Sequence, residues 1–148
     1  MIHRKIFFVF LLAAMACLAE AADLVKKPSQ KGVQETMDKL EAVVRDKGLT
    51  VFIRIDHQAN ARKAGLEQPA AQVLIFGNPK IGTAIMTQDP AAGLDLPLRV
   101  LVYQDKEGKT WISYHDPQAL KQSYGVAGVP AVDKVTKALM GITDAAAK

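Results

Sequence analysis

The sequence predicts a small α+β domain in which helices cover one face of a curved, mostly antiparallel sheet. Hydrophobic residues recur at helical spacing in an early and in a late segment, while four segments between them have the pattern of strands. Short turns join the later strands, whereas parallel strands would need long crossovers. The expected order is β-α-β-β-β-β-α, with no repeat and no linker, so we expect a single domain over residues 22–148.

The first expected elements are a short edge strand at Leu24 and Val25 and an amphipathic helix. Ser29 is a candidate cap for this helix, and Lys47-Gly48 supplies a basic last turn followed by a terminating glycine. Apolar residues at helical spacing define its buried side: Val33, Met37, Leu40 and Val44.

Alternation of side chains and turn residues predict the strands. In the first of them, Val51, Ile53, Ile55 and His57 share one face. A loop rich in charged residues, 105–109, predicts a hairpin between the last two. The expected strands are 49–57, 70–76, 96–103 and 110–114.

Cap residues and glycines predict the remaining helices. Asn78-Pro79 suits a helix start, because asparagine caps free N–H groups and proline lacks the donor that would be unpaired there. Asp116-Pro117 is a similar start, and Gly65 ends one or two helical turns. The expected helical segments are 59–65, 78–86, 116–124 and 131–140, followed by a frayed tail at 144–148.

The N-terminal residues predict export. His3, Arg4 and Lys5 precede an apolar run over 6–16, and Ala19-Glu20-Ala21 matches a signal-peptidase site. The apolar run is shorter than the roughly 20 residues of a membrane span. We therefore expect a signal peptide over 1–21, cleavage after Ala21, a periplasmic or secreted protein and no membrane span in the mature chain. A lipoprotein anchored at Cys17 is the alternative.

Composition removes several classes of function. Cys17 is the only cysteine, so cleavage after Ala21 leaves no thiol for disulfides, metal ligation or nucleophilic catalysis. The formal net charge is +4, but the cations are interleaved with carboxylates and form no basic stripe, so we expect no nucleic-acid partner. Aromatic residues make up 6% of the chain, too few to suggest haem or flavin, and we expect no cofactor and no metal centre.

The predicted sheet has an apolar second face, on the side away from the helices. Its members by alternation are Phe52, Leu74, Phe76, Leu101 and Tyr103. Monomeric proteins rarely expose such a patch. A homodimer interface, a ligand groove and cover by the chain's own loops are all consistent with it, and we favour the two-fold dimer, the commonest oligomer.

Two strings of residues, IFGNPKIGTAIM and LDLPLRVLVYQD, resemble the bacterial domain-of-unknown-function family numbered 302. GLTVFIRIDH and WISYHDP resemble it too, and the resemblance extends over residues 29–140. It implies a single α+β domain, often dimeric, with no established activity. Many relatives carry cysteines where this chain has Gly77 and Leu98, so thiol chemistry cannot be transferred to it.

One candidate binding site lies at the start of the 78–86 helix. Asn78, Lys80 and Thr83 could hold a carboxylate or a phosphate there, although a plain structural cap explains the same residues. Arg54 and Arg99 are expected on the second face, where they could neutralise an acidic ligand or pair with acids such as Asp56.

Asp56-His57 and His115-Asp116 are the candidate acid–base residues. Where the two strand ends meet, they could act near neutral pH or hold a cation, but adjacent strand residues point to opposite faces, and structural roles explain them equally. The expectation is an exported binding or accessory module for a small acidic ligand or an envelope protein. The alternatives are a hydrolase or isomerase using Asp56, His57 or His115, and a purely structural envelope dimer.

Overall fold

A computed structural model describes residues 23–148 of the chain. The signal peptide predicted over 1–21, its cleavage after Ala21 and the alternative anchor at Cys17 lie outside these residues. Within 23–148, no helix combines the length and the apolar character that crossing a bilayer requires.

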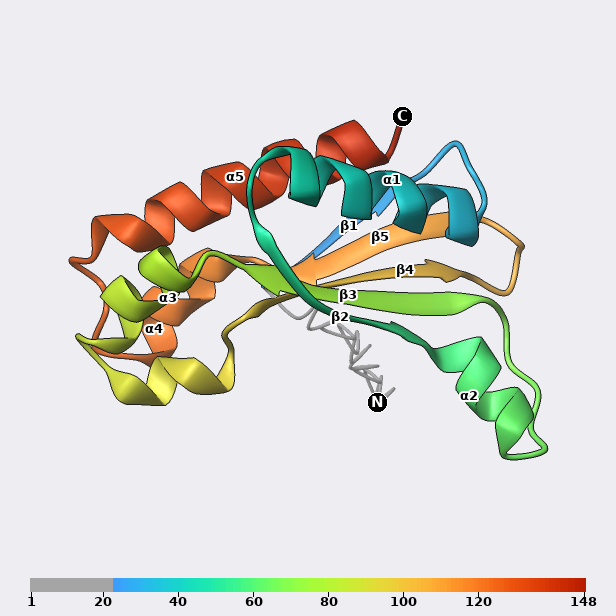
Figure 1. Cartoon of the computed structure of the whole chain (residues 1–148), viewed down its shortest axis with the longest axis horizontal. Helices are drawn as coiled ribbons and strands as arrows, with labels where there is room; N and C mark the ends of the chain where they lie inside the picture. The colour runs from blue at the N-terminus through green and yellow to red at the C-terminus, as the bar shows by residue number, and fades with distance from the viewer. Residues whose placement is uncertain (1–22) are drawn as a thin grey trace, which may run out of the picture.

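A five-stranded antiparallel sheet forms the centre of the domain (Figure 1). Strands β2 to β5 follow one another as neighbours, and β1 pairs with β5 at the other edge, so the order is β1-β5-β4-β3-β2. This confirms the α+β class. The strands are β1 (Leu24–Pro28), β2 (Thr50–Asp56), β3 (Ala71–Gly77), β4 (Leu98–Gln104) and β5 (Thr110–His115).

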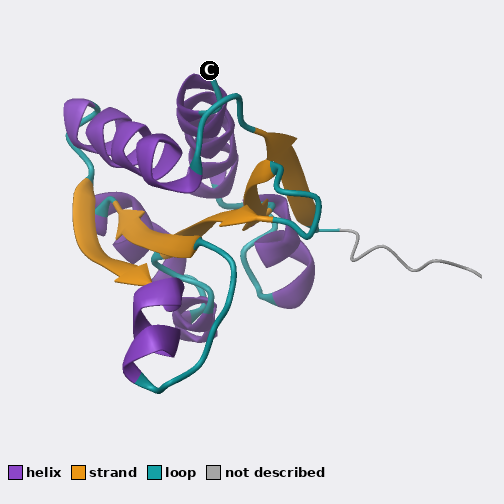
Figure 2. Ribbon diagram, turned by 90° about the vertical axis from the view of Figure 1, so that its right-hand side faces the viewer, coloured by secondary structure: helices purple, strands orange, loops and turns teal. Residues whose placement is uncertain are grey.

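Two long helices, α1 (Val33–Asp46) and α5 (Pro130–Ala146), lie side by side over one face of the sheet (Figures 1 and 2). Short helices occupy the connections between strands and before α5. These are α2 (His57–Lys63), α3 (Pro79–Met86), the 3-10 turn η1 (Pro90–Leu94), the 3-10 turn η2 (Pro117–Ala119) and α4 (Leu120–Ser123).

The main core lies between the sheet and these two long helices. All four apolar positions predicted for the first helix are buried in it, which confirms the helical spacing. The strands and α5 contribute Leu74, Phe76, Val100, Val102, Ile112, Tyr114, Leu139 and Ile142. A second cluster joins α3, η1 and α4 to the start of α5, and its members are Ile85, Ala92, Leu120, Val126, Val132 and Val135.

The prediction of which strand residues face the helices was wrong for β2 and β3. Leu74 and Phe76 were expected on the second face, but both are fully buried beneath the helices. The cause in β2 is a bulge between Val51 and Ile53, after which Ile53 pairs with Ile75. The side without α1 and α5, here called the opposite face, carries Arg99 and the large apolar residues Ile53, Ile55, Val73, Ile75, Leu101, Tyr103 and Trp111. Leu101 and Tyr103 are therefore on the predicted side.

Three predicted boundaries also differ from the structure. Ser29 does not cap α1, which begins after Gly32; its hydroxyl instead lies 2.7 Å from that of Thr36. His57 does not extend β2 but is the first residue of α2. The last helix continues to Ala146 rather than fraying from residue 144, because its final turns bury apolar side chains.

Candidate functional site

An apolar cleft of about 270 Å³ lies between α3, the Leu96–Leu98 segment and the bulged part of β2. Ile81, Ile85 and Met86 of α3 form one wall. The other lining residues are Phe52, Gly77, Asn78, Pro79, Gly82, Thr83, Leu96, Pro97, Leu98 and Val135. No lining side chain carries a charge.

Local sequence explains why the cleft forms here. Asn78 accepts hydrogen bonds from the backbone N–H groups of Lys80 and Ile81, at 3.0 and 3.3 Å, and so starts α3 directly after β3. Pro79 takes the first helical position, as predicted. The bulge leaves Phe52 52% exposed beside the cleft. A Cβ at Gly77 would lie 3.5 Å from Pro97 and 3.8 Å from Phe52, both ordinary contact distances, so the two sides of the cleft lie close together at this point.

The three residues of the predicted anion site are not brought together. Asn78 and Thr83 line the cleft, whereas Lys80 does not. With 3.6 residues per helical turn, Lys80 and Ala84 lie on the side of α3 opposite the lining residues. The Asn78 oxygen already accepts two of the N–H groups that would bind an anion.

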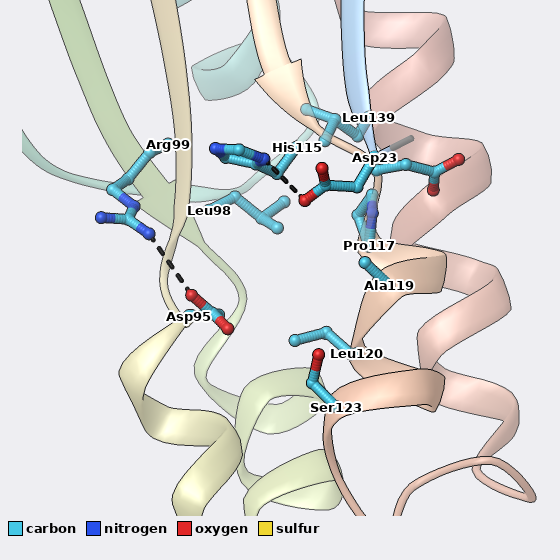
Figure 3. A pocket seen from close by; sticks show the side chains of 11 residues that line it. Asp23, Asp95, Leu98, Arg99, His115, Pro117, Ala119, Leu120, Ser123 and Leu139 are labelled. Carbon is cyan, nitrogen blue, oxygen red and sulfur yellow. Dashed lines mark hydrogen bonds and ion pairs between the residues drawn. The ribbon is translucent and has the colours of Figure 1, made fainter. Parts of the chain in front are cut away.

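A second, charged pocket of about 170 Å³ lies at the end of β5 (Figure 3). Nδ1 of His115 lies 2.8 Å from an oxygen of Asp23, and Nη2 of Arg99 lies 3.5 Å from Asp95. Asp116 also lines it, so the lining contains three carboxylates and one guanidinium. This balance disfavours an acidic ligand there.

The hydroxyl of Tyr124 connects this pocket to the loop before α5. It donates to Asp95 at 2.6 Å, and this hydrogen bond, with burial and the charges of Asp95 and Asp89, raises the pKa of Tyr124. Asp95 thus has both Arg99 and Tyr124 as partners, which fixes its position at the rim.

Arg54 does not share a face with Arg99, contrary to the prediction. It pairs in register with Leu74 on the helix side of the sheet, whereas Arg99 pairs with Ile75 on the opposite face. Arg54 instead contacts Asp38 of α1, so its role is in holding the fold. The alternative prediction, that Arg54 pairs with an acidic residue, is confirmed, but the partner is Asp38 and not Asp56.

The predicted acid–base residues are also separated. Asp56 caps α2 by accepting from the N–H of Ala59 at 2.9 Å, and His57 is exposed. His115 lies on β5, from which β2 is separated by β4 and β3. The one histidine–carboxylate pair among the candidates uses Asp23, a residue 92 positions away that no sequence pattern indicated. In Figure 3, Ser123 lies at the other end of the pocket from this pair.

The described part of the chain assembles no group of three or more histidine, aspartate or glutamate side chains that could hold a metal ion. Sequence reasoning identified Asn78 and Thr83 but missed Phe52, Leu96 and Met86 as lining residues. The apolar character of α3 was visible, but nothing indicated which strand it would face.

Five antiparallel strands with two long helices on one face define the chain as a small α+β domain. A family model described as "Domain of unknown function DUF302" matches residues 25–146, and the chain belongs to this family. A solved structure of an uncharacterized conserved protein DUF302 from Bacillus stearothermophilus has a similar fold, with a TM-score of 0.72 at 22% identity. The similarity covers 84% of this chain and 98% of that one.

Three curated relatives carry the name of an ion channel. The chain is 41% identical over 103 residues to "Fluoride-specific ion channel FluC 1" of Brucella suis biovar 1 (strain 1330), which is 70% of this chain and 41% of the relative. It is equally similar to "Fluoride-specific ion channel FluC 2" of Brucella melitensis biotype 1, over 38% of that protein. The chain thus spans about two fifths of the length of the curated relatives it matches.

Proposed function

We propose that this protein is a binding module that holds a small, largely apolar molecule in the cleft beside α3. The observation that carries this proposal is the cleft itself: about 270 Å³, with a lining that is apolar except for Asn78 and Thr83. Ligand sites in proteins have this character, mostly apolar with a few polar groups. For comparison, an engineered apolar cavity of about 150 Å³ is enough to bind benzene.

This proposal changes the expected class of ligand from acidic to largely apolar. A strongly acidic molecule would need cations, yet Lys80 lies away from the cleft and Arg99 is outnumbered by carboxylates in its pocket. The contacts therefore support binding through apolar surface more than through charge.

A cavity-filling variant tests the proposal. A Cβ at Gly82 would lie 3.9 Å from the Met86 methyl group, so Gly82→Leu fits locally and places its remaining carbons in the cleft. Leucine is also a better helix former than glycine, by about 0.8 kcal/mol, so the fold should survive. Ala84→Leu, on the side of α3 away from the cleft, is the matched control.

The probe is 2-octanone, followed by ¹H–¹⁵N NMR shifts. We expect saturable shifts at residues of α3 and at Phe52 in the parent and in Ala84→Leu, and their loss in Gly82→Leu. The absence of saturable shifts in the parent, or their persistence in Gly82→Leu, would overturn the proposal.

A second candidate function comes from the curated relatives. Proteins named as fluoride-specific ion channels contain a segment similar to 70% of this chain. Joining two modules covalently keeps them at high effective concentration, which is useful where the two act together. We therefore propose that this chain, as an exported protein, is an accessory module of a membrane ion channel, with a fluoride channel as the first candidate partner.

Fluoride tolerance tests this second function. Deleting the gene should lower the fluoride concentration that stops growth, and a plasmid copy should restore it, with chloride at the same concentration as the control. Equal growth of the deletion strain and its parent in fluoride would contradict the association. Mass analysis of the protein from the periplasm should show an N-terminus at Ala22 if it is exported as predicted.

We also propose that two copies pair through the opposite face. The supporting observation is that this face carries large apolar side chains that remain accessible, with Ile53 50% exposed. Closed two-fold pairing would cover both copies at once.

A further inference from the structure

We propose that the cleft selects molecules with an oxygen acceptor at one end, bound by the side-chain N–H₂ group of Asn78 and the hydroxyl of Thr83. The inference rests on the proposed binding function and adds the chemistry that the ligand must offer. A ketone or an ester on an apolar chain has this chemistry, without a charge for which the cleft offers no cation.

The orientation of Asn78 is fixed by its role as a helix cap. An asparagine amide can usually be placed with its oxygen and nitrogen exchanged. Here the oxygen accepts from two backbone N–H groups at the start of α3, and a nitrogen in that position could accept neither. Because Asn78 lines the cleft, its remaining polar group, the N–H₂, is the one available there. Within residues 23–148 this nitrogen has no hydrogen-bond partner.

Thr83 provides a second donor on the lining of the cleft. Its backbone oxygen accepts from the Thr87 hydroxyl at 2.6 Å, but its own hydroxyl has no partner among the described residues. A hydroxyl can donate or accept, whereas the amide nitrogen only donates. No carboxylate lines the cleft, so a ligand that offers only donors finds no strong acceptor among the lining side chains. The pair therefore favours an acceptor oxygen.

Three probes with chains of the same length separate the possibilities. Octanoate and 2-octanone each carry an acceptor oxygen, and octylammonium carries donors only. We expect 2-octanone to bind about threefold to tenfold more tightly than octylammonium, the effect of one or two net hydrogen bonds. Octanoate should bind more weakly than 2-octanone, because the cleft has no cation to pair with its charge. The side-chain ¹⁵N–¹H signals of Asn78 should shift on addition of 2-octanone.

Asn78→Asp is the decisive variant. Aspartate caps helices about as well as asparagine, so α3 should be retained, but the N–H₂ donor becomes an acceptor. Binding of 2-octanone should weaken about threefold to tenfold, while binding of octylammonium should not weaken. Thr83→Val should also weaken 2-octanone binding, and Thr87→Val, which removes a hydroxyl from the same helix outside the cleft, should leave it unchanged.

The outcomes distinguish this inference from the proposed function. If no probe binds the parent, or if Gly82→Leu leaves binding intact, the binding function itself fails. If probes bind and Gly82→Leu blocks them, but the three bind equally or Asn78→Asp leaves 2-octanone unaffected, the acceptor selectivity is wrong and the apolar cleft stands.

Discussion

Arg54 on the edge strand β2 lies 2.6 Å from a carboxylate oxygen of Asp38 on α1. The same nitrogen is 3.3 Å from Glu41, and the rest of the guanidinium donates twice to the buried Gln72. Gln72 in turn donates to Gln34 of α1 at 2.9 Å. One side chain thus joins the outermost strand to its neighbour and to the helix above.

This network predicts a dependence of stability on pH. The hydrogen bond from Arg54 lowers the pKa of Asp38, and hydrogen bonds first from Arg45 and then from Arg54 lower the pKa of Glu41. A carboxyl whose pKa is lower in the folded state stabilises the fold above its unfolded pKa, about 3.9 for aspartate and 4.3 for glutamate. That contribution is lost as the pH falls through the folded value.

Arg54→Ala should therefore lower the free energy of unfolding by about 1–2 kcal/mol at pH 7, mostly through the unpaired oxygen of Gln72. The ion pair contributes less, because the side chain of Asp38 is 55% exposed. Urea unfolding at pH 7 and pH 3 should show a smaller difference from the parent at pH 3. Arg62→Ala, on exposed α2, should change little at either pH. A loss of stability equal at both pH values would contradict the role of the carboxylates.

Much of the fold followed from local patterns because the physical causes are local. The apolar spacing of α1, the cap at Asn78 and the glycine with positive φ after α1, Gly48, depend on neighbouring residues. Which face of a strand packs against the helices, by contrast, depends on residues far away in the sequence. Val73 to Phe76 are all apolar, so their alternation cannot tell the core side from the opposite side, and the bulge near Phe52 shifts the pattern of β2.

The sites were harder to predict because they join distant parts of the chain. The cleft combines β2, α3, the Leu96–Leu98 segment and α5, and the His115–Asp23 pair joins the end of β5 to the residue before β1. Only Asn78 and Thr83 had a local signal, the helix start itself. The positive charge of Arg54 suggested a ligand contact, but Asp38 of α1 neutralises it. The sequence could not place that helix beside β2.

The corrected faces of the sheet give opposite expectations for two substitutions. Ile53→Asp places a charge on a half-exposed residue of the opposite face, so the subunit should remain folded and the proposed dimer should dissociate. Phe76→Asp buries a charge in the core and should prevent folding. Native mass spectrometry and circular dichroism measure the two effects, with Lys39→Asp on the exposed side of α1 as the control. A parent protein that is monomeric at micromolar concentration, or a dimer unchanged in Ile53→Asp, would contradict the pairing.

The final turns of α5 should be essential to stability, although the helix was expected to end at residue 140 and the chain to fray from residue 144. Ile142, Thr143 and Ala146 are fully buried, and Lys27 of β1 donates to Thr143 at 2.9 Å, which ties the helix end to the first strand. Ile142→Ala removes buried carbon from the main core and should lower the free energy of unfolding by about 2–4 kcal/mol. Met140→Ala, at a side chain that is 51% exposed, should cost under about 1 kcal/mol. Urea denaturation monitored by circular dichroism gives both values. Equal small losses would mean that the helix end contributes little, whereas the expected difference would show that residues beyond 140 complete the core.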